Sequence, residues 1–174
     1  MRRRNFLLSG GLAAAGIAPC ARGQVAKTLR YGFPVAETGF DPAQVSDLYS
    51  RTIIANIFEA LYTYDYLARP AVLKPCTALA MPEVGDDFRT WTIRLRPGVF
   101  FADDPTFNGR RELVAADYVY SIKRFFDPRT KSPNYNTFDR EGMLGLAELR
   151  SEALKTGRFD YDREVDGLRA PDRY

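Results

Sequence analysis

Apolar residues recur at helical spacing between residues 115 and 126. Val119, Ile122 and Phe126 fall on one side of a helix drawn through this segment, which is the pattern of a helix that packs against a core. The Asp127-Pro128 step follows directly, and a residue before proline avoids helical backbone angles. We therefore predict a helix over 115–126.

Two further helices are predicted. Ser46 and Asp47 are suitable N-cap residues, and the apolar positions that follow predict a helix continuing to about Tyr62. A third helix is predicted over 143–155, after a polar stretch that begins beyond Lys131. The apolar stripe of the helix that begins near Asp47 comprises Ile53, Ile54, Ile57, Phe58 and Leu61.

Alternation of apolar and polar residues predicts the strands. Residues 28–35 alternate and predict a half-buried strand, and residues 90–96 alternate most clearly, with Trp91, Ile93 and Leu95 on the face expected to be buried. We expect these two strands to share a sheet, and without that pairing the transport function inferred below would have to be abandoned. Short extended runs are predicted at residues 62–66 and 99–101, and loops around Pro70, Pro75 and Pro82. The irregular mixture of strands and helices indicates an α+β (mixed α/β) fold.

The N-terminus has the features of an export signal. Three arginines at positions 2–4 precede an apolar run from Phe6 to Ala18, which at about 13 residues is shorter than the roughly 20 that span a bilayer. The string Arg3-Arg4-Asn5-Phe6-Leu7 resembles the twin-arginine (Tat) motif R-R-x-F-L,. We therefore predict that residues 1–23 are a Tat-type signal peptide and that residues 24–174 are the mature part of the chain.

Alternatives to that processing stay open. A general secretory signal also begins with basic residues. Cys20 could carry a lipid anchor, but Pro19 directly before it fits a lipoprotein signal poorly, so cleavage after Gly23 is preferred. On either route the protein is expected outside the cytoplasm, in the periplasm.

Composition excludes several function classes. The chain contains no His among its 174 residues, which excludes Ser-His-Asp catalysis and His-ligated metals. It has 25 basic and 22 acidic residues, but four of the arginines lie within residues 1–23. The mature part therefore has 21 basic and 22 acidic residues, and no basic surface of the kind that nucleic-acid binding requires is expected. Cys76 would be its only thiol, so no internal disulfide is expected.

Candidate chemistry in the mature part is sparse. The carboxylate pairs Asp103/Asp104 and Asp162/Glu164 could bind a metal, although solvated turns are the simpler interpretation. Residues 109–111 could bind phosphate, but they lack a glycine-rich strand-to-helix loop. Cys76 has no histidine to activate it. The aromatic residues Tyr118, Tyr120, Phe125 and Phe126 could line a ligand site or simply form core. We predict no catalytic residue, no metal site and no cofactor.

Several motifs, taken in order, carry a family resemblance. Residues 91–101 read W-T-I-R-L-R-P-G-V-F-F and resemble the W-T-F-x-L-R-x-G-V-x-F signature of family 5 extracellular solute-binding proteins. Phe40-Asp41-Pro42 resembles the family's LDP step, and residues 57–61 resemble x-F-E-G-L. Pro75 to Ala80 resembles P-x-LA, and residues 115–124 resemble T-A-x-D-V-x-Y-S-x-x-R. The loop after Phe101 and the region around Met81-Pro82 depart from the family pattern.

The resemblance implies a fold and a function. Members of this family are two-lobed periplasmic binding proteins of the Venus-flytrap type, much longer than this chain, so residues 24–174 would form an incomplete first lobe. The implied protein is the substrate-binding component of an ABC importer, which closes on a peptide or similar small solute by hinge motion and then meets the membrane permease. An exported Tat-dependent enzyme and a truncated fragment that binds nothing are the alternatives.

The resemblance also indicates where ligand would bind. By position, the segment between Asp41-Pro42 and Phe58 corresponds to the cleft edge of the family's first lobe. We expect ligand contacts there, chiefly through main-chain groups, and a further contact after Ser132-Pro133. The predicted ligand-binding residues are Ser46, Asp47, Leu48, Tyr49 and Tyr135.

Overall fold

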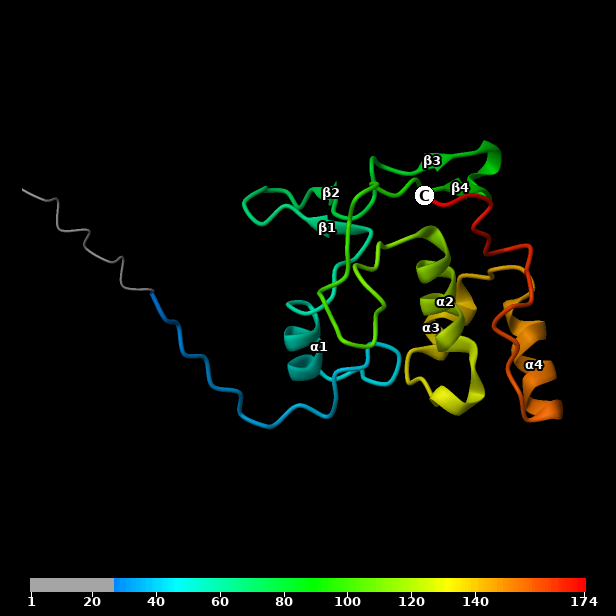
Figure 1. Ribbon diagram of the computed structural model, residues 1–174, viewed down its shortest axis with the longest axis horizontal. Helices are drawn as coiled ribbons and strands as arrows, with labels where there is room; N and C mark the ends of the chain where they lie inside the picture. The colour runs from blue at the N-terminus through cyan, green and yellow to red at the C-terminus, as the bar shows by residue number, and fades with distance from the viewer. Residues whose placement is uncertain (1–26) are drawn as a thin grey trace, which may run out of the picture. The chain divides into compact units, whose positions relative to one another are not determined.

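The computed structural model describes residues 27–174 (Figure 1). The chain divides into two units, Met1–Gly32 and Phe33–Tyr174, and residues 27–32 of the first form neither helix nor strand. The predicted signal peptide, residues 1–23, and Cys20 lie outside the described residues. None of the described helices is long and apolar enough to cross a bilayer. The elements of the second unit are α1 (Leu48–Ile54), β1 (Tyr62–Tyr64), β2 (Leu73–Pro75), β3 (Glu83–Val84), the 3₁₀ turn η1 (Asp86–Phe88), β4 (Trp91–Thr92), α2 (Ala115–Phe126), the 3₁₀ turn η2 (Pro128–Thr130), α3 (Tyr135–Arg140) and α4 (Leu146–Thr156).

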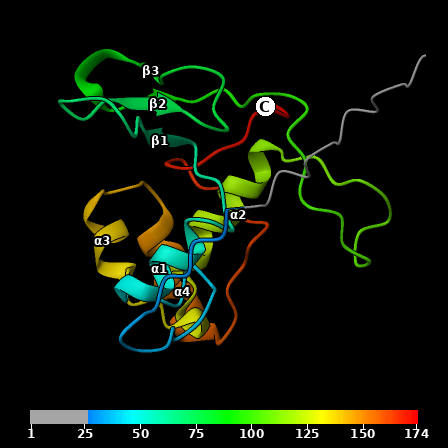
Figure 2. The same ribbon diagram turned by 90° about the vertical axis from the view of Figure 1, so that its left-hand side faces the viewer.

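The core of the second unit lies where α2, α4 and residues 159–165 meet (Figures 1 and 2). Helix α2 presents Phe126 to this core, and the side chains of Phe125 and Phe138 stack beside it with ring centroids 4.1 Å apart. Burial of these apolar surfaces is the main stabilising contribution of the helical part. The buried members of the cluster are Phe126, Leu146, Leu149, Ala153, Phe159 and Val165.

Local capping sets the ends of the two core helices. The main-chain N–H of Val114 donates to Asp117 Oδ2 at 2.9 Å, and the predicted stop at Asp127-Pro128 is confirmed because α2 ends at Phe126. Helix α4 is flanked by Gly145 and Gly157, with φ angles of 85° and 75°. These left-handed angles favour glycine at both ends of the helix.

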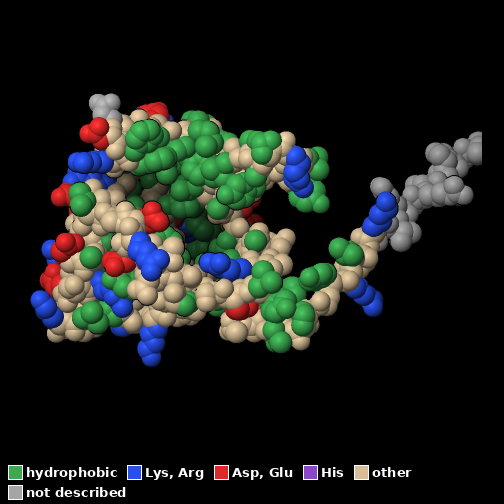
Figure 3. All heavy atoms as spheres, turned by 180° about the vertical axis from the view of Figure 1, so that it is seen from behind, with side chains coloured by type: hydrophobic (Ala, Val, Ile, Leu, Met, Phe, Trp, Pro, Cys, Tyr) green, Lys and Arg blue, Asp and Glu red, His purple; other side chains and the backbone are tan. Residues whose placement is uncertain are grey.

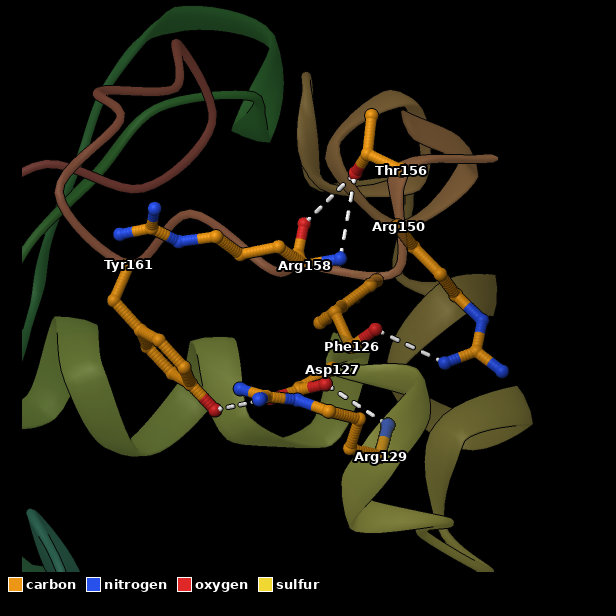
Figure 4. A network of polar contacts seen from close by, with 7 residues as sticks. All are labelled: Phe126, Asp127, Arg129, Arg150, Thr156, Arg158 and Tyr161. Carbon is orange, nitrogen blue, oxygen red and sulfur yellow. Dashed lines mark hydrogen bonds and ion pairs between the residues drawn. The ribbon is translucent and has the colours of Figure 1, made fainter. Parts of the chain in front are cut away.

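A buried lysine connects α2 to the segment after α4. Lys123 Nζ donates to the carbonyl oxygens of Tyr161 and Arg163, at 2.7 Å each. In the same region, Tyr161 Oη donates to Asp127 Oδ2 at 2.9 Å, and Asp127 also accepts from Arg129 N (Figure 4). Burial, and then the Asp127 carboxylate, raises the pKa of the Tyr161 hydroxyl to about 12. The segment is therefore attached to α2 by hydrogen bonds as well as by apolar contact.

The strands form two small antiparallel pairs. In the first, Tyr62 faces Pro75 and Tyr64 faces Leu73. In the second, β3 pairs with β4, so that Val84 faces Trp91. The predicted extended run at residues 62–66 is thus confirmed for 62–64, while β2 and β3 lie in the stretch for which we expected loops. The fold is a mixture of helix and strand, as predicted.

The expected first strand is absent from the described residues. Residues 28–35 have no regular structure, and Leu29 and Tyr31 are 89% and 73% exposed. Alternation alone predicts a strand only if a neighbouring strand completes the ladder of hydrogen bonds, and the two described sheets do not include this segment. The expectation that it shares a sheet with the Trp91 strand was therefore wrong.

The strand predicted over 90–96 is also shorter and more exposed than expected. Only Trp91–Thr92 is a strand, with a single bridge between Ala78 and Leu95 further on. Leu95 is 4% exposed, as predicted, but Trp91 is 55% exposed and Ile93 is also exposed. Most residues of β1, β2, β3 and β4 are exposed. Hydrophobic side chains accordingly gather on the face of the molecule seen in Figure 3.

The remaining helices differ in detail from the prediction. Helix α1 ends at Ile54, not near Tyr62, and Ile57 and Phe58 of the expected stripe are exposed. The run Thr52-Ile53-Ile54 is β-branched and has low helix propensity, which favours an early end. Helix α4 confirms the predicted third helix to within three residues, whereas α3 was not predicted.

The C-terminal residues also contact the rest of the unit. Ala115 N donates to the Arg173 carbonyl at 2.9 Å, and Arg173 Nη2 pairs with Glu112 Oε2 at 2.8 Å.

Candidate functional site

The segment that leads into α1 is organised around Asp47. This residue is the N-cap of α1 and accepts from Ser50 N at 2.8 Å through Oδ1. Its other oxygen accepts from Thr38 Oγ1 at 2.5 Å, while Thr38 N donates to the buried Ser50 Oγ at 2.9 Å. Hydrogen bonds with Ser50, and then with Thr38, lower the pKa of Asp47 to about 2. Asp47 is thus ionised at neutral pH and serves a structural role.

A second carboxylate connects the same segment to α2. Asp41 accepts two hydrogen bonds from Arg124, at 2.9 Å for Nη1 to Oδ1 and 2.5 Å for Nη2 to Oδ2. Asp41 Oδ1 also accepts from Ala43 N at 3.0 Å. Partial burial raises the pKa of Asp41, but the bonds from Arg124 and Ala43 outweigh it, and the pKa lies below its usual value.

A third link joins the two groups of predicted ligand contacts. Asn134 Nδ2 donates to the Val45 carbonyl at 2.9 Å. Val45 directly precedes Ser46, and Asn134 directly precedes Tyr135. The two segments that were chosen from the sequence, 89 residues apart, therefore lie side by side.

The predicted residues differ in how their side chains are placed. Ser46 is exposed, Leu48 is 69% exposed, and Tyr49 is half-buried against Phe33, with ring centroids 5.3 Å apart. The Tyr135 ring packs edge-on against the core residue Phe126 at 5.7 Å, and the Arg150 guanidinium lies 4.0 Å above it. Burial, and then the Asp139 carboxylate, raises the pKa of Tyr135. Ser46 and Leu48 are thus free to meet a ligand, whereas the ring of Tyr135 is largely occupied by packing.

A hollow of about 270 Å³ lies beside these segments. It is bordered by α1, α3, the end of α2 and the turn before α1. The lining residues are Pro42, Val45, Arg51, Ile54, Phe125, Asn134, Thr137 and Phe138.

The other chemical candidates from the sequence have ordinary structural surroundings. Asp104 accepts from the main-chain N–H and the hydroxyl of Thr106, at 2.8 and 2.7 Å. Arg111 forms an ion pair with Asp117 and lies over Phe101, and Arg110 lies over the Phe100 ring. The described part of the chain contains no group of three or more side chains of the types that ligate metals.

Two residues that organise the site were not selected from the sequence. Asp41 and Arg124 both lie in the motifs that carried the family resemblance, but they were given no role there. The signal was present as an acidic residue before proline and a basic residue on the polar side of a helix. Their distance of 83 residues along the chain means that only the folded structure reveals the pair.

Comparison with known proteins assigns the family. Residues 72–174 match the sequence profile of the bacterial extracellular solute-binding proteins, family 5 middle region. The absent pairing between the Trp91 strand and residues 28–35 counted against the transport interpretation. The match begins at residue 72, however, so it does not depend on that pairing.

Individual relatives agree with the profile. A di/tripeptide-binding protein of Pseudomonas aeruginosa is 31% identical over 140 residues, which are 74% of this chain and 24% of the relative. The dipeptide-binding protein of Escherichia coli K12 is 31% identical over 88% of this chain and 28% of its own length. A glutathione-binding protein of Pectobacterium atrosepticum is 27% identical over 78% and 24%. The chain thus spans about a quarter of the length of the curated relatives it matches.

One solved structure is also similar. The pheromone receptor PrgZ, whose mode of peptide binding is described with its structure, superposes with a TM-score of 0.49. It is 27% identical, and the alignment covers 74% of this chain and 23% of the receptor.

Proposed function

This chain belongs to family 5 of the bacterial extracellular solute-binding proteins, and from that premise we propose that it captures a peptide or a similar small solute for an ABC importer. The match over residues 72–174 is the single observation that carries the proposal. The relatives named for dipeptides, di/tripeptides and glutathione favour a short peptide. The family is one of binding proteins, and binding of this kind makes and breaks no covalent bond. The partners proposed are the solute and the permease subunits in the membrane.

We further propose that the segment Ser46–Tyr49 contacts the ligand, mainly through its main chain. The links from Asp41 to Arg124 and from Val45 to Asn134 fix the chain that leads into this segment. The N–H groups of Leu48 and Tyr49 donate to no acceptor among residues 27–174. Main-chain donors on a fixed segment suit peptides, because they recognise the backbone and tolerate different side chains.

The substitution Leu48→Pro tests this contact sharply. Leu48 is the first residue of α1, where proline is well tolerated,. Asp47, the residue before it, already has the extended angles φ −73° and ψ 154° that proline requires of its neighbour,. The substitution therefore removes one N–H with little effect on the helix. The matched control is Leu48→Ala, which truncates the same side chain but keeps the N–H.

Calorimetric titration of the full-length protein with a panel of di- and tripeptides gives the measurement. We expect binding by the wild type and by Leu48→Ala, and an affinity about tenfold weaker for Leu48→Pro, the loss of one buried hydrogen bond to a ligand. Equal affinity for both variants would remove this segment from the site. A thermal-shift screen against peptides, sugars and cofactors in which only a cofactor binds would overturn the proposed function.

We also propose export through the twin-arginine route to the periplasm. The support is the sequence of residues 1–23 and the extracellular character of the family. Replacing Arg3 and Arg4 together by Lys should retain the protein in the cytoplasm if the Tat route is used, and leave export unchanged if the general secretory route is used. Incorporation of a fatty-acid probe that is lost in Cys20→Ser would show a lipid anchor instead.

A further inference from the structure

The hollow between α1 and α3 has mainly apolar walls. Phe125 and Phe138, whose rings stack, form one part of it, and Val45 and Ile54 form another. Its volume of about 270 Å³ is below the roughly 300–1,000 Å³ of sites for drug-sized ligands. A space of this size accepts a single amino-acid residue, not a long segment.

One charged side chain borders this apolar space. Arg51 lies on α1, and no carboxylate among residues 27–174 lies within ion-pair distance of its guanidinium. Asp47 is one helical turn away, but both of its oxygens are engaged by Ser50 and Thr38. The hollow therefore offers a planar cation with five N–H donors and no acidic partner.

Two neutral groups add hydrogen-bonding capacity. Asn134 uses its Nδ2 to donate to Val45, and its Oδ1 has no donor among the described residues. The Thr137 hydroxyl also lines the hollow and makes no hydrogen bond within residues 27–174. A ligand that placed a carboxylate against Arg51 could thus also donate an N–H to Asn134 Oδ1.

We propose that this hollow binds a carboxylate that bears one apolar side chain, with the carboxylate paired to Arg51 and the side chain against Phe125 and Phe138. A free apolar amino acid and the C-terminal residue of a peptide share this chemistry. The identification of the bound carboxylate with the C-terminus of a peptide rests on the function proposed above. Val45 and Asn134 line the hollow and directly precede Ser46 and Tyr135, so the hollow adjoins the segment proposed to contact the peptide main chain.

The test uses the full-length protein, freed of bound ligand by unfolding and refolding, and N-acetyl-leucine as the probe. N-acetyl-leucine amide has the same side chain without the charge, and N-acetyl-glycine has the same charge without the apolar side chain. We expect calorimetric titration to show N-acetyl-leucine binding about tenfold more tightly than either compound. Arg51→Gln should abolish the preference for the acid over the amide. The matched control is Arg140→Gln, since Arg140 is also an exposed helical arginine without an ion pair and lies outside the hollow.

The possible results of this titration distinguish a failure of the proposed hollow from a failure of the proposed peptide-binding function. Equal affinity for acid and amide, or an equal loss in Arg51→Gln and Arg140→Gln, would overturn the proposed hollow even if peptides bind. A third outcome is that N-acetyl-leucine binding depends on Arg51 but peptides bind equally well with free and amidated C-termini. The hollow would then take a free amino acid and not a peptide end. Binding of N-acetyl-leucine that depends on Arg51, with no peptide bound, would support the hollow and refute the proposed peptide function.

Discussion

Asp41 and Arg124 form a two-pronged ion pair that connects the turn before α1 to α2, 83 residues later. Both side chains are about 30% exposed, at 28% and 31%. The pair is therefore screened less than a surface ion pair, and its planar geometry is of the kind that makes arginine hard to replace by lysine.

Removing one partner of this pair is expected to destabilise the protein. Arg124→Met leaves the partly buried Asp41 carboxylate with Ala43 N as its remaining donor, and we expect a loss of about 1–3 kcal/mol in the free energy of unfolding. Urea denaturation of the wild type, Arg124→Met and the exposed control Arg140→Met measures it. An unfolding midpoint equal to that of the control would contradict a structural role for the pair.

The buried carboxylates predict an acid-sensitive stability. The pKa values of Asp41 and Asp127 lie below the unfolded value of 3.8, because hydrogen bonds to each carboxylate outweigh the effect of burial. The ionised forms thus stabilise the fold above pH 3.8, and this contribution is lost as pH falls through the lowered folded-state values.

We expect the urea midpoint to be nearly constant from pH 7 to 5 and to fall below pH of about 4. Asp127→Asn should lower stability at neutral pH and reduce this dependence, so that the variant and the wild type approach one another near pH 3. A constant difference between the two at all pH values would mean that the Asp127 charge is not the cause.

Lys123 gives a third prediction. Its substitution by Met keeps most of the side-chain volume but leaves the carbonyls of Tyr161 and Arg163 without their buried donor. We expect a loss of about 2–4 kcal/mol, and faster hydrogen exchange in residues 158–168. The same substitution at the exposed Lys155 is the control, with an expected change within about 0.5 kcal/mol. Similar effects at the two lysines would be inconsistent with the observed bonds.

Gly167 gives a fourth prediction, which concerns space and not polarity. A Cβ at this position would overlap the main chain of Leu144, to whose carbonyl Gly167 N donates at 2.8 Å. Gly167→Ala should therefore destabilise the protein by more than about 2 kcal/mol, since main chain cannot move aside as a side chain can. Gly32→Ala, where a Cβ would meet nothing within 4 Å, should change the thermal midpoint little.

The elements predicted correctly from the sequence are those that local residue patterns determine without a distant partner. Helix α2 has an apolar stripe and a proline stop, and its predicted bounds are those observed. Asp47, one of the two residues predicted as N-caps, is the N-cap of α1. Helix α3 was missed because Tyr135–Arg140 has only six residues, and its two core-facing rings, Tyr135 and Phe138, are too few to establish a helical period.

The strands were less predictable because a strand depends on its partner. Both residues 28–35 and residues 90–96 alternate, yet only Trp91–Thr92 pairs with another strand. The candidate site likewise depends on partners that are distant in the sequence. Family motifs located Ser46–Tyr49, but the bonds that fix this segment, through Asp41 and Val45, come from residues more than 80 positions away.

The way in which this segment is fixed has a consequence for divergence among homologues. The side chains of Ser46 and Leu48 form no hydrogen bond or ion pair within residues 27–174 and point away from the packed core, whereas the bonds to Arg124 and Asn134 use neighbouring positions. Substitutions at positions 46 and 48 therefore leave these bonds in place, so the side chains there can vary among homologues while the main chain of the segment keeps its position.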